Sequence, residues 1–167
     1  MARLGCLMAG CALVVSLAAG AKAQGLEISE FLAINDGGLA DEDGSHPDWI
    51  EIHNGGPAAV DLGGWHLTDD ALDLSKWSFP STLLAPGGYL VVFASDKDRA
   101  RSGQPLHANF KLAGEGDYLA LVAPDGATVA WQIAPAYPPQ RANVSAGPAG
   151  LVDTTERLPV HSTVRWH

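Results

Sequence analysis

The stretch ADEDGSHPDWIEIHN, residues 40–54, gathers five carboxylates within eleven positions. They are Asp41, Glu42, Asp43, Asp48 and Glu51. Carboxylate oxygens bind calcium, and a pair of them can act as the acid and base of a glycosidase. Short Asp side chains also accept backbone N–H bonds and thereby shape turns. The stretch is therefore open to three interpretations: a metal site, a catalytic pair or a turn.

Calcium binding is the chemical interpretation that these residue types favour. The candidate ligands are Asp41, Asp43, Asp48, Asp69 and Asp70, the last two from the later LTDD segment. However, Gly44 falls at the fourth position of a calcium loop rather than the sixth, and Ile52 stands where the twelfth-position Glu belongs. We therefore favour a turn that leads through Pro47 into a strand, and keep calcium as the alternative and as the only cofactor considered.

Catalytic patterns are weak along the chain. Asp48 and Glu51 are the one carboxylate pair that could serve a glycosidase, and G-x-S-x-G is missing. The histidines lack metal-ligand spacing, and the glycines of LAGEGDY are not followed by a helix that could bind phosphate. We expect no catalytic residue, no cofactor-binding residue and no enzyme activity.

Charge is distributed unevenly along the sequence. Between Gln24 and Ser75 there are 12 acids and neither Lys nor Arg, whereas from Lys76 onward there are 7 acids and 8 basic residues. Nucleic-acid binding needs basic contacts to phosphate, so this balance argues against a nucleic-acid partner. The segment SDKDRARSG forms a small basic loop that could contact acids of a partner.

The amino-terminal segment has the features of a secretory signal peptide, residues 1–23. Arg3 precedes an apolar run, and Ala21-Lys22-Ala23 forms a small-x-small cleavage site. Met8–Cys11 offers a lipoprotein-type site as the rival interpretation. Both cysteines lie in this segment, so the mature chain would contain none. We expect a secreted protein, extracellular or periplasmic or associated with the cell surface, without a membrane span after cleavage.

Short apolar runs punctuated by Gly, Pro, Asn and Asp predict an all-β fold. The expected strands are Leu26–Ile34, Asp48–Asn54, Val60–Leu62, Trp65–Leu67, Lys76–Phe79, Tyr89–Ala94, Phe110–Leu112, Asp117–Ala123 and Ala127–Ile133. Pro124-Asp125-Gly126 predicts a hairpin, and Asp96–Arg101 is the one short helix candidate. This number of strands fits an immunoglobulin-like β-sandwich with buried tryptophans.

The domain is expected to span residues 24–134. From residue 135 to 167 the sequence is rich in Pro, Gly and Ala without periodicity, which predicts an irregular tail or linker. Asn143-Val144-Ser145 is a glycosylation triplet, which matters only in a eukaryotic source.

Several ordered motifs together are similar to one known family. They are ISEFLAIN, DEDGSHPDWIEIHN, VDLGGWHLTDD, KWSFP, LAPGGYLVVFAS and LHANFKLAGEGDYLALVAPDG. The chain resembles the bacterial, secreted branch of the lamin tail domain family from about Leu26 to Ile133. The resemblance implies an immunoglobulin-like sandwich and a non-catalytic module, and bacterial relatives are often one part of larger secreted or surface proteins. APAYPPQRANVSAG, residues 134–147, is similar to the segment that leads out of this domain.

We therefore expect an extracellular binding or adhesion module that recognises a protein or cell-surface partner, with carbohydrate as the other partner considered. Loops at the end of the sandwich would make the contacts, namely residues 35–48, 69–75 and 96–106. Two alternatives stay open: an accessory domain or fragment of a larger secreted hydrolase or nuclease, and a calcium-dependent carbohydrate-binding module. The sequence does not name the partner or the oligomeric state.

Overall fold

The computed structural model describes residues 14–15 and 25–147, and within these residues every regular element is a β-strand. The strands are β1 (Val14–Val15), β2 (Leu26–Leu32), β3 (Asp48–Asn54), β4 (Val60–Asp61), β5 (His66–Thr68), β6 (Trp77–Ser78), β7 (Leu83–Leu84), β8 (Tyr89–Ala94), β9 (Leu106–Ala108), β10 (Leu119–Val122) and β11 (Val129–Ala134). No helix in the described part of the chain has the length and hydropathy to cross a bilayer.

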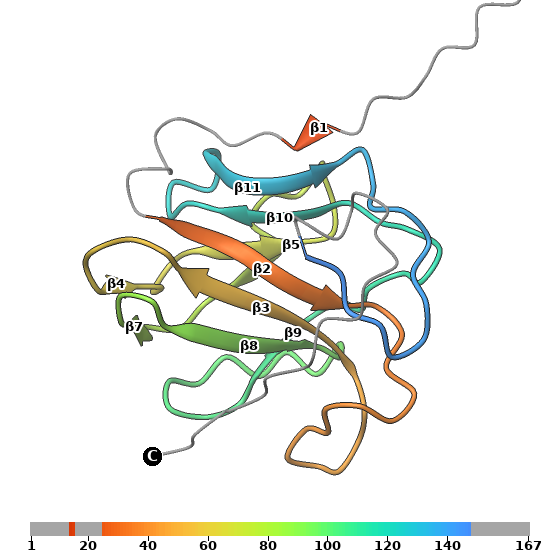
Figure 1. Ribbon diagram of the computed structural model, residues 1–167. Coiled ribbons are helices and arrows are strands. Elements are labelled where there is room, and N and C mark those ends of the chain that lie inside the picture. Colours follow the sequence, from red (N-terminus) through yellow and green to blue (C-terminus); the bar gives the residue numbers. More distant parts are fainter. Residues whose placement is uncertain (1–13, 16–24, 148–167) are drawn as a thin grey trace, which may run out of the picture.

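Two sheets face each other and form an immunoglobulin-like sandwich (Figure 1). One sheet has the strand order β1-β11-β10-β5-β6 and the other has the order β2-β3-β8-β9, while β4 and β7 form a separate two-stranded ribbon. All pairings are antiparallel except β8 with β9. The all-β sandwich predicted from the sequence is confirmed.

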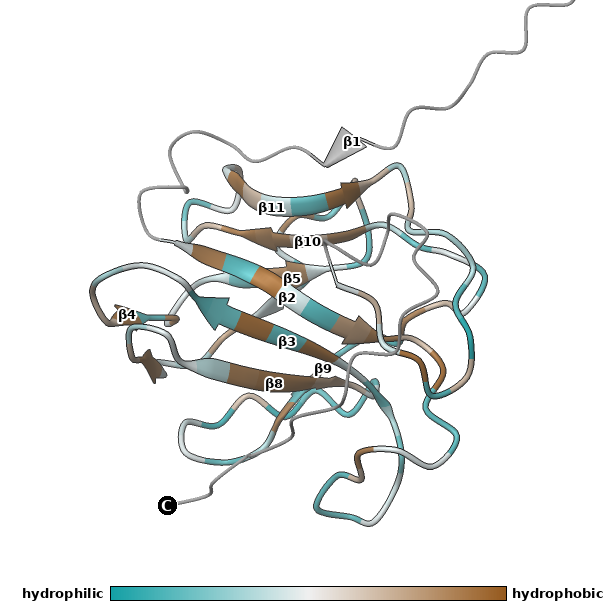
Figure 2. Cartoon of the chain, in the orientation of Figure 1, coloured by the Kyte–Doolittle hydropathy of each residue, from teal (hydrophilic) through white to brown (hydrophobic). Residues whose placement is uncertain are grey.

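Alternation along β3 shows how the sequence produces the layers. Ile50 and Ile52 are fully buried in the core, whereas Trp49, Glu51 and His53 are partly exposed on the opposite face. Because successive strand residues point to opposite faces, this pattern fixes which side of β3 meets the other sheet. Figure 2 shows the same alternation of hydrophobic and hydrophilic residues along β2 and β3.

The core lies between the sheets and includes three of the four tryptophans outside the tail. Trp65, Trp77 and Trp131 are 2–3% exposed, as the sequence predicts, whereas Trp49 is only partly buried on the outer face. All buried core residues of the described chain fall between Leu26 and Tyr137. The hairpin predicted at residues 124–126 joins β10 to β11, with a register shift after Leu121.

Two local predictions are wrong. The helix expected at Asp96–Arg101 is absent, because Asp96 and Asp98 have positive φ angles of 65° and 49° and the Arg99 N–H bonds to the carbonyl of His107. The strand expected at Phe110–Leu112 is irregular, and β9 precedes it instead. Phe110 is buried from a loop, whereas the buried His107 interrupts the apolar pattern of β9 and conceals this strand in the sequence.

The segment after β11 also differs from the expected loose tail. Residues 135–147 contain no strand, but Tyr137 is 2% exposed and its hydroxyl donates to the carbonyl of Ala113 at 2.9 Å. Further along, Ala146 and Phe31 exchange two backbone hydrogen bonds of 2.8 and 2.9 Å. This segment therefore packs on the sandwich. The rest of the expected tail, residues 148–167, and the predicted signal peptide apart from β1 lie outside the described residues.

Asn54 at the end of β3 joins two turns. Its amide group is fully buried and donates to the carbonyls of Ala58 at 2.9 Å and Leu84 at 3.0 Å, while Oδ1 accepts the N–H of Gly56 at 3.0 Å. The side chain thus satisfies backbone groups of both turns from a fully buried position. It fixes the turn after β3 against β7.

We predict that Asn54→Asp lowers the free energy of unfolding by about 2–3 kcal/mol, because a carboxylate would face carbonyl oxygens that need a donor. Urea denaturation measures this change. The exposed Gln104→Asn serves as a control and should change stability by less than about 0.5 kcal/mol. Equal stability of Asn54→Asp and the wild type would contradict the assigned hydrogen bonds.

Candidate functional site

The strand directions bring five irregular segments to one end of the sandwich. We call residues 33–47, 69–76, 95–105, 109–118 and 135–147 the charged end. These segments follow β2, β5, β8 and β11 or precede β3, β6 and β10, and the pairing registers place those strand ends together in each sheet. Because β9 is parallel to β8 and Arg99 pairs with His107, residues 100–105 turn back along β8, away from this end. Figure 1 shows the long loop between β2 and β3 and the segment after β11 on this side, opposite β4 and β7. Of the three loops predicted to make contacts, residues 35–48 and 69–75 lie at this end, apart from Asp48 at the start of β3, and residues 96–106 begin there.

The five segments contain every Lys and Arg of residues 25–147, namely Lys76, Lys97, Arg99, Arg101, Lys111 and Arg141. All of these except Arg101, which lies where the chain turns back toward β9, are at the charged end itself. The same segments carry eleven acids, so both signs of charge are concentrated there with an excess of negative charge. The remaining acids of the described chain lie on β2, β3 and the opposite end. Within the described residues, charged side chains are thus concentrated at one end of the sandwich.

At the centre of the charged end, the acidic loop predicted from the sequence meets the basic loop. Lys97 Nζ contacts Asp41 Oδ2 and lies 2.8 Å from Asp43 Oδ2. Arg99 lies 2.6 Å from Glu42 Oε1 and 2.8 Å from Asp43 Oδ2. Three consecutive carboxylates therefore share two cations that lie more than fifty residues away in the sequence.

His107 lies beneath this ion-pair network. Its side chain is fully buried, and its Nε2 is 3.0 and 3.1 Å from the two carboxylate oxygens of Glu42. Nδ1 lies 2.8 Å from the Ser95 hydroxyl, and the imidazole stacks on Phe93 with the ring centroids 5.1 Å apart. Both ring nitrogens are therefore bonded, which holds the imidazole in one orientation under the acidic loop.

The local backbone explains how each loop presents its charges. Asp41 Oδ1 accepts the N–H groups of Asp43 at 3.0 Å and Ser45 at 2.9 Å, and Gly44 has a positive φ of 76°. This is the turn chemistry that the sequence favours for Asp41. On the facing loop, the left-handed Asp96 and Asp98 flank Lys97, and short polar side chains tolerate that conformation better than most.

These contacts keep the three acids ionised. Burial of the Asp41 carboxyl raises its pKa, but the Lys97 ammonium and the Ser45 N–H outweigh burial and hold the pKa below its usual value. Burial likewise opposes a lower pKa at Glu42, where hydrogen bonds from its own backbone, His107 and Arg99 prevail. Hydrogen bonds from Arg99 and Lys97 lower the pKa of Asp43 to about 2.

A second group of acids adjoins the first: Asp48 begins β3, next to the charged end, and Asp69 and Asp117 belong to segments of that end. Burial raises the pKa of Asp48 to about 6, although the N–H groups of Leu112 and Asn35 bond to the carboxylate. Asp69 forms an ion pair of 2.6 Å with Lys76. Burial, together with the charge of Asp69, raises the pKa of Asp117. In this group Lys76 forms an ion pair with Asp69. The half-buried carboxyls of Asp48 and Asp117 therefore bind a proton more readily than exposed carboxyls do.

The five candidate calcium ligands do not form one cluster. Asp41 and Asp43 come together on Lys97, Asp48 lies at the start of β3, and Asp69 pairs with Lys76 in another loop. Asp70 bonds through Oδ1 to the Leu72 N–H at 2.8 Å. Calcium binding by this set stays a prediction.

The structure groups a different set of donor atoms. Within residues 25–147, one three-donor group has its atoms within 4.8 Å of one another, and it consists of Asp41, Glu42 and His107. Lys97 and Arg99 already neutralise these carboxylates. The sequence analysis missed the roles of Glu42 and His107, and their separation by 65 residues leaves no local pattern that could have revealed the contact.

The proposed glycosidase pair is not assembled either. Asp48 and Glu51 are three residues apart on β3 and therefore point to opposite faces of the strand. Glu51 Oε1 accepts the hydroxyl of Ser29 at 2.7 Å on the outer face. No single substrate bond could lie between these two carboxyl groups.

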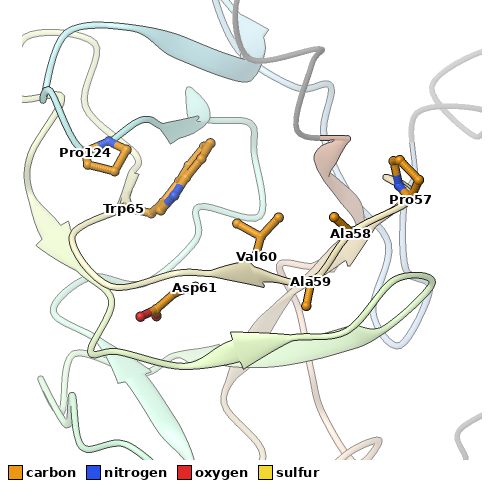
Figure 3. Close-up of a pocket in the computed structure, with 7 residues that line it drawn as sticks. All are labelled: Pro57, Ala58, Ala59, Val60, Asp61, Trp65 and Pro124. Carbon is orange, nitrogen blue, oxygen red and sulfur yellow. The ribbon is translucent and has the colours of Figure 1, made fainter.

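The opposite end of the sandwich carries an open groove of about 500 Å³. Its lining residues are Pro57, Ala58, Ala59, Val60, Asp61, Trp65 and Pro124. Figure 3 shows Val60 directed toward Trp65, whereas Asp61 points to the other side. Asp61 bonds to Ser81 at 2.9 Å, so the groove lacks the convergent polar groups of a small-molecule site.

A family model described as Lamin Tail Domain matches residues 19–134, which is more than half of the chain and includes both sheets. No curated protein matches the sequence. The match agrees with the resemblance found in the sequence motifs and with the observed sandwich.

We predict that Lys97→Ala lowers the free energy of unfolding by about 2–4 kcal/mol, because it leaves the buried Asp41 carboxylate without its cation. Chemical denaturation at pH 7 gives the change. Lys111→Ala is the matched control, since Lys111 is exposed and has no ion pair among the described residues. A loss no larger than that of the control would show that the network does not stabilise the loops.

For Asp48 we predict that a substitution raises the free energy of unfolding instead of lowering it. Its folded pKa of about 6 is above the unfolded value near 3.8, so its contribution to stability is complete at low pH and is lost as pH rises through 6. Asp48→Asn should therefore be more stable than the wild type at pH 8, by about 1 kcal/mol once solvent screening is allowed for. The difference should shrink toward pH 4. Thermal unfolding across this range measures it, and a pH-independent difference would refute the assignment.

Proposed function

This chain belongs to the lamin tail domain family, and we propose that it is a non-catalytic extracellular module that binds a protein or cell-surface partner through the charged end. The observation that carries the proposal is the concentration of five of the six Lys and Arg residues and most of the acids of residues 25–147 at one end of the sandwich. Loops on a rigid sandwich are a common position for binding residues.

The ion-pair network supports binding because it orders the loops before a partner arrives. Lys97 and Arg99 join residues 41–43 to the segment after β8, and the fully buried His107 supports both from below. An ordered surface loses less conformational entropy on binding than a mobile one. The charged end is thus suited to recognition of a partner by charge complementarity.

Two cations at this end are available for such contacts. Lys111 and Arg141 are exposed and take part in no ion pair within the described residues. Asp96 and Asp98 alternate with Lys97 and Arg99 on the facing loop, so both signs of charge are present. A partner surface with both signs of charge fits this pattern, whereas a nucleic acid would be repelled by the excess of acids.

The absence of an assembled catalytic pair in the described chain supports the non-catalytic part of the proposal. Asp41, Glu42 and Asp43 are held ionised by cations, and Asp48 and Glu51 point apart. The extracellular part rests on the predicted signal peptide, residues 1–23, with its apolar run and its Ala-Lys-Ala cleavage site.

The test is binding of the purified, fluorescently labelled protein to the surface of cells of the source organism, followed by flow cytometry. We expect saturable binding that weakens by about fivefold in Lys111→Glu and in Arg141→Glu, because rim charges change association rates. Raising the salt concentration should weaken wild-type binding in the same direction.

The matched control is Ala85→Glu, which adds one negative charge at an exposed position on the opposite end of the sandwich. It should bind like the wild type. Equal weakening by all three variants would show that net charge, rather than the charged end, controls binding, and unchanged binding by all three would also contradict the proposal.

A further inference from the structure

Sheet edges expose unpaired backbone N–H and C=O groups, which makes an unprotected edge a site for strand addition. In the five-stranded sheet, β11 is the outermost long strand, and only the two-residue β1 lies beyond it (Figure 1). The six residues of β11, VAWQIA, contain neither a charged residue nor a proline. Natural edge strands usually carry one of these protective features.

The other edges of the described sandwich are short or covered. The β2 edge pairs with Ala146 through two hydrogen bonds to Phe31, and the β9 edge pairs with Arg99 through two hydrogen bonds to His107. On the far side of the five-stranded sheet, β6 has only two residues. Within residues 25–147, β11 is therefore the longest uncovered and uncharged edge.

The structure also shows one segment that pairs with the β11 edge. Val14 and Val15 form β1 and pair antiparallel with β11, with Val14 opposite Ala134 and Val15 opposite Ile133. This backbone pairing covers only the carboxyl end of β11. These two residues belong to the apolar run that the sequence predicts to be removed with the signal peptide.

We propose that, in the processed protein, the edge of β11 binds an extended, uncharged, β-branched segment of a partner polypeptide by antiparallel strand addition. β1 shows the geometry: main-chain hydrogen bonds give affinity, and the register places the incoming residues opposite Ile133 and Ala134. The inference rests on the export proposed above, because cleavage after Ala23 is what uncovers the edge.

The test uses a chain that begins at Gln24, which keeps every core residue between Leu26 and Tyr137. The probe is a fluorescent peptide with the sequence ALVVSLA, residues 12–18, followed by lysines for solubility. We expect saturable binding by anisotropy and slower amide hydrogen exchange in residues 129–134. The full-length chain, with β1 in place, should bind the peptide more weakly.

Two N-methylated peptides separate strand addition from apolar adsorption. Neighbouring N–H groups of an extended chain point to opposite sides, so only one of Val14 and Val15 can donate to β11. Methylation of that nitrogen should weaken binding by about tenfold, and methylation of the other by less than about threefold. Equal affinities of the two methylated peptides would overturn the proposal.

A pair of protein variants locates the site. Ala134→Lys places a charge on the β11 edge and should weaken peptide binding, whereas Ser78→Lys places the same charge on β6 and should not. Protection outside residues 129–134 would overturn the proposal. A dimer in sedimentation velocity, with β11 protected without peptide, would also overturn it by assigning the edge to a second copy.

The amino-terminal sequence of the exported protein distinguishes this inference from the proposed function. Retention of residues 14–15 would leave the β11 edge covered and would overturn strand addition in the exported form. Binding through the charged end would be unaffected by that result, because its ion pairs join residues 41–43 to Lys97 and Arg99 and include no residue of β1 or β11.

Discussion

Lys97 lies between the carboxylates of Asp41 and Asp43, and the conformation of two long loops depends on this contact. Asp41 has a fully buried side chain that could not remain charged in that position without a nearby cation. Once Lys97 is in place, Arg99 reaches Glu42, and Glu42 reaches the buried His107. The acidic loop is thereby fixed on the outer face of the β8–β9 pair.

The rest of the charged end follows from sandwich topology. Strands that alternate in direction deliver their connections to two opposite ends, and here the long, polar connections all begin at the same end. The connection from β8 to the parallel β9 is the one that turns back along the sheet, at residues 100–105. The opposite end has short turns rich in Pro and Gly, including Pro57 and Pro124 beside the groove. The two ends therefore present different chemistry to a partner: fixed charges of both signs at one, and apolar side chains with little polar anchoring at the other.

Much of the fold could be predicted from local patterns. The alternation of Ile50 and Ile52 with polar neighbours defines β3, and the turn residues around Gly126 define the last hairpin. The turn chemistry of Asp41 was also predictable, because its partners are only a few residues away. These are short-range interactions, which the sequence displays directly.

The site could be predicted only in part, because its partners are distant in the sequence. Nothing local indicates that Lys97 lies on Asp41, or that His107 is buried under Glu42. The same reason explains the missed β9, whose central residue is a histidine made acceptable in the interior by Ser95 and Glu42. Some buried polar residues have hydrogen-bond partners that are distant in the sequence. Such residues interrupt the apolar pattern on which strand prediction depends.

The segment that follows β11 has a mechanical consequence. Tyr137 anchors it beside Phe31, with the ring centroids 4.7 Å apart, and Ala146 then pairs with Phe31 near the end of β2 through two hydrogen bonds. Asn143 and Ser145 add hydrogen bonds to Ile34 and Glu30. A tension applied from residues beyond Gly147 would load these bonds first and the buried tyrosine next. Because the whole packed core holds the two sheets together, the segment would detach before the sheets began to separate.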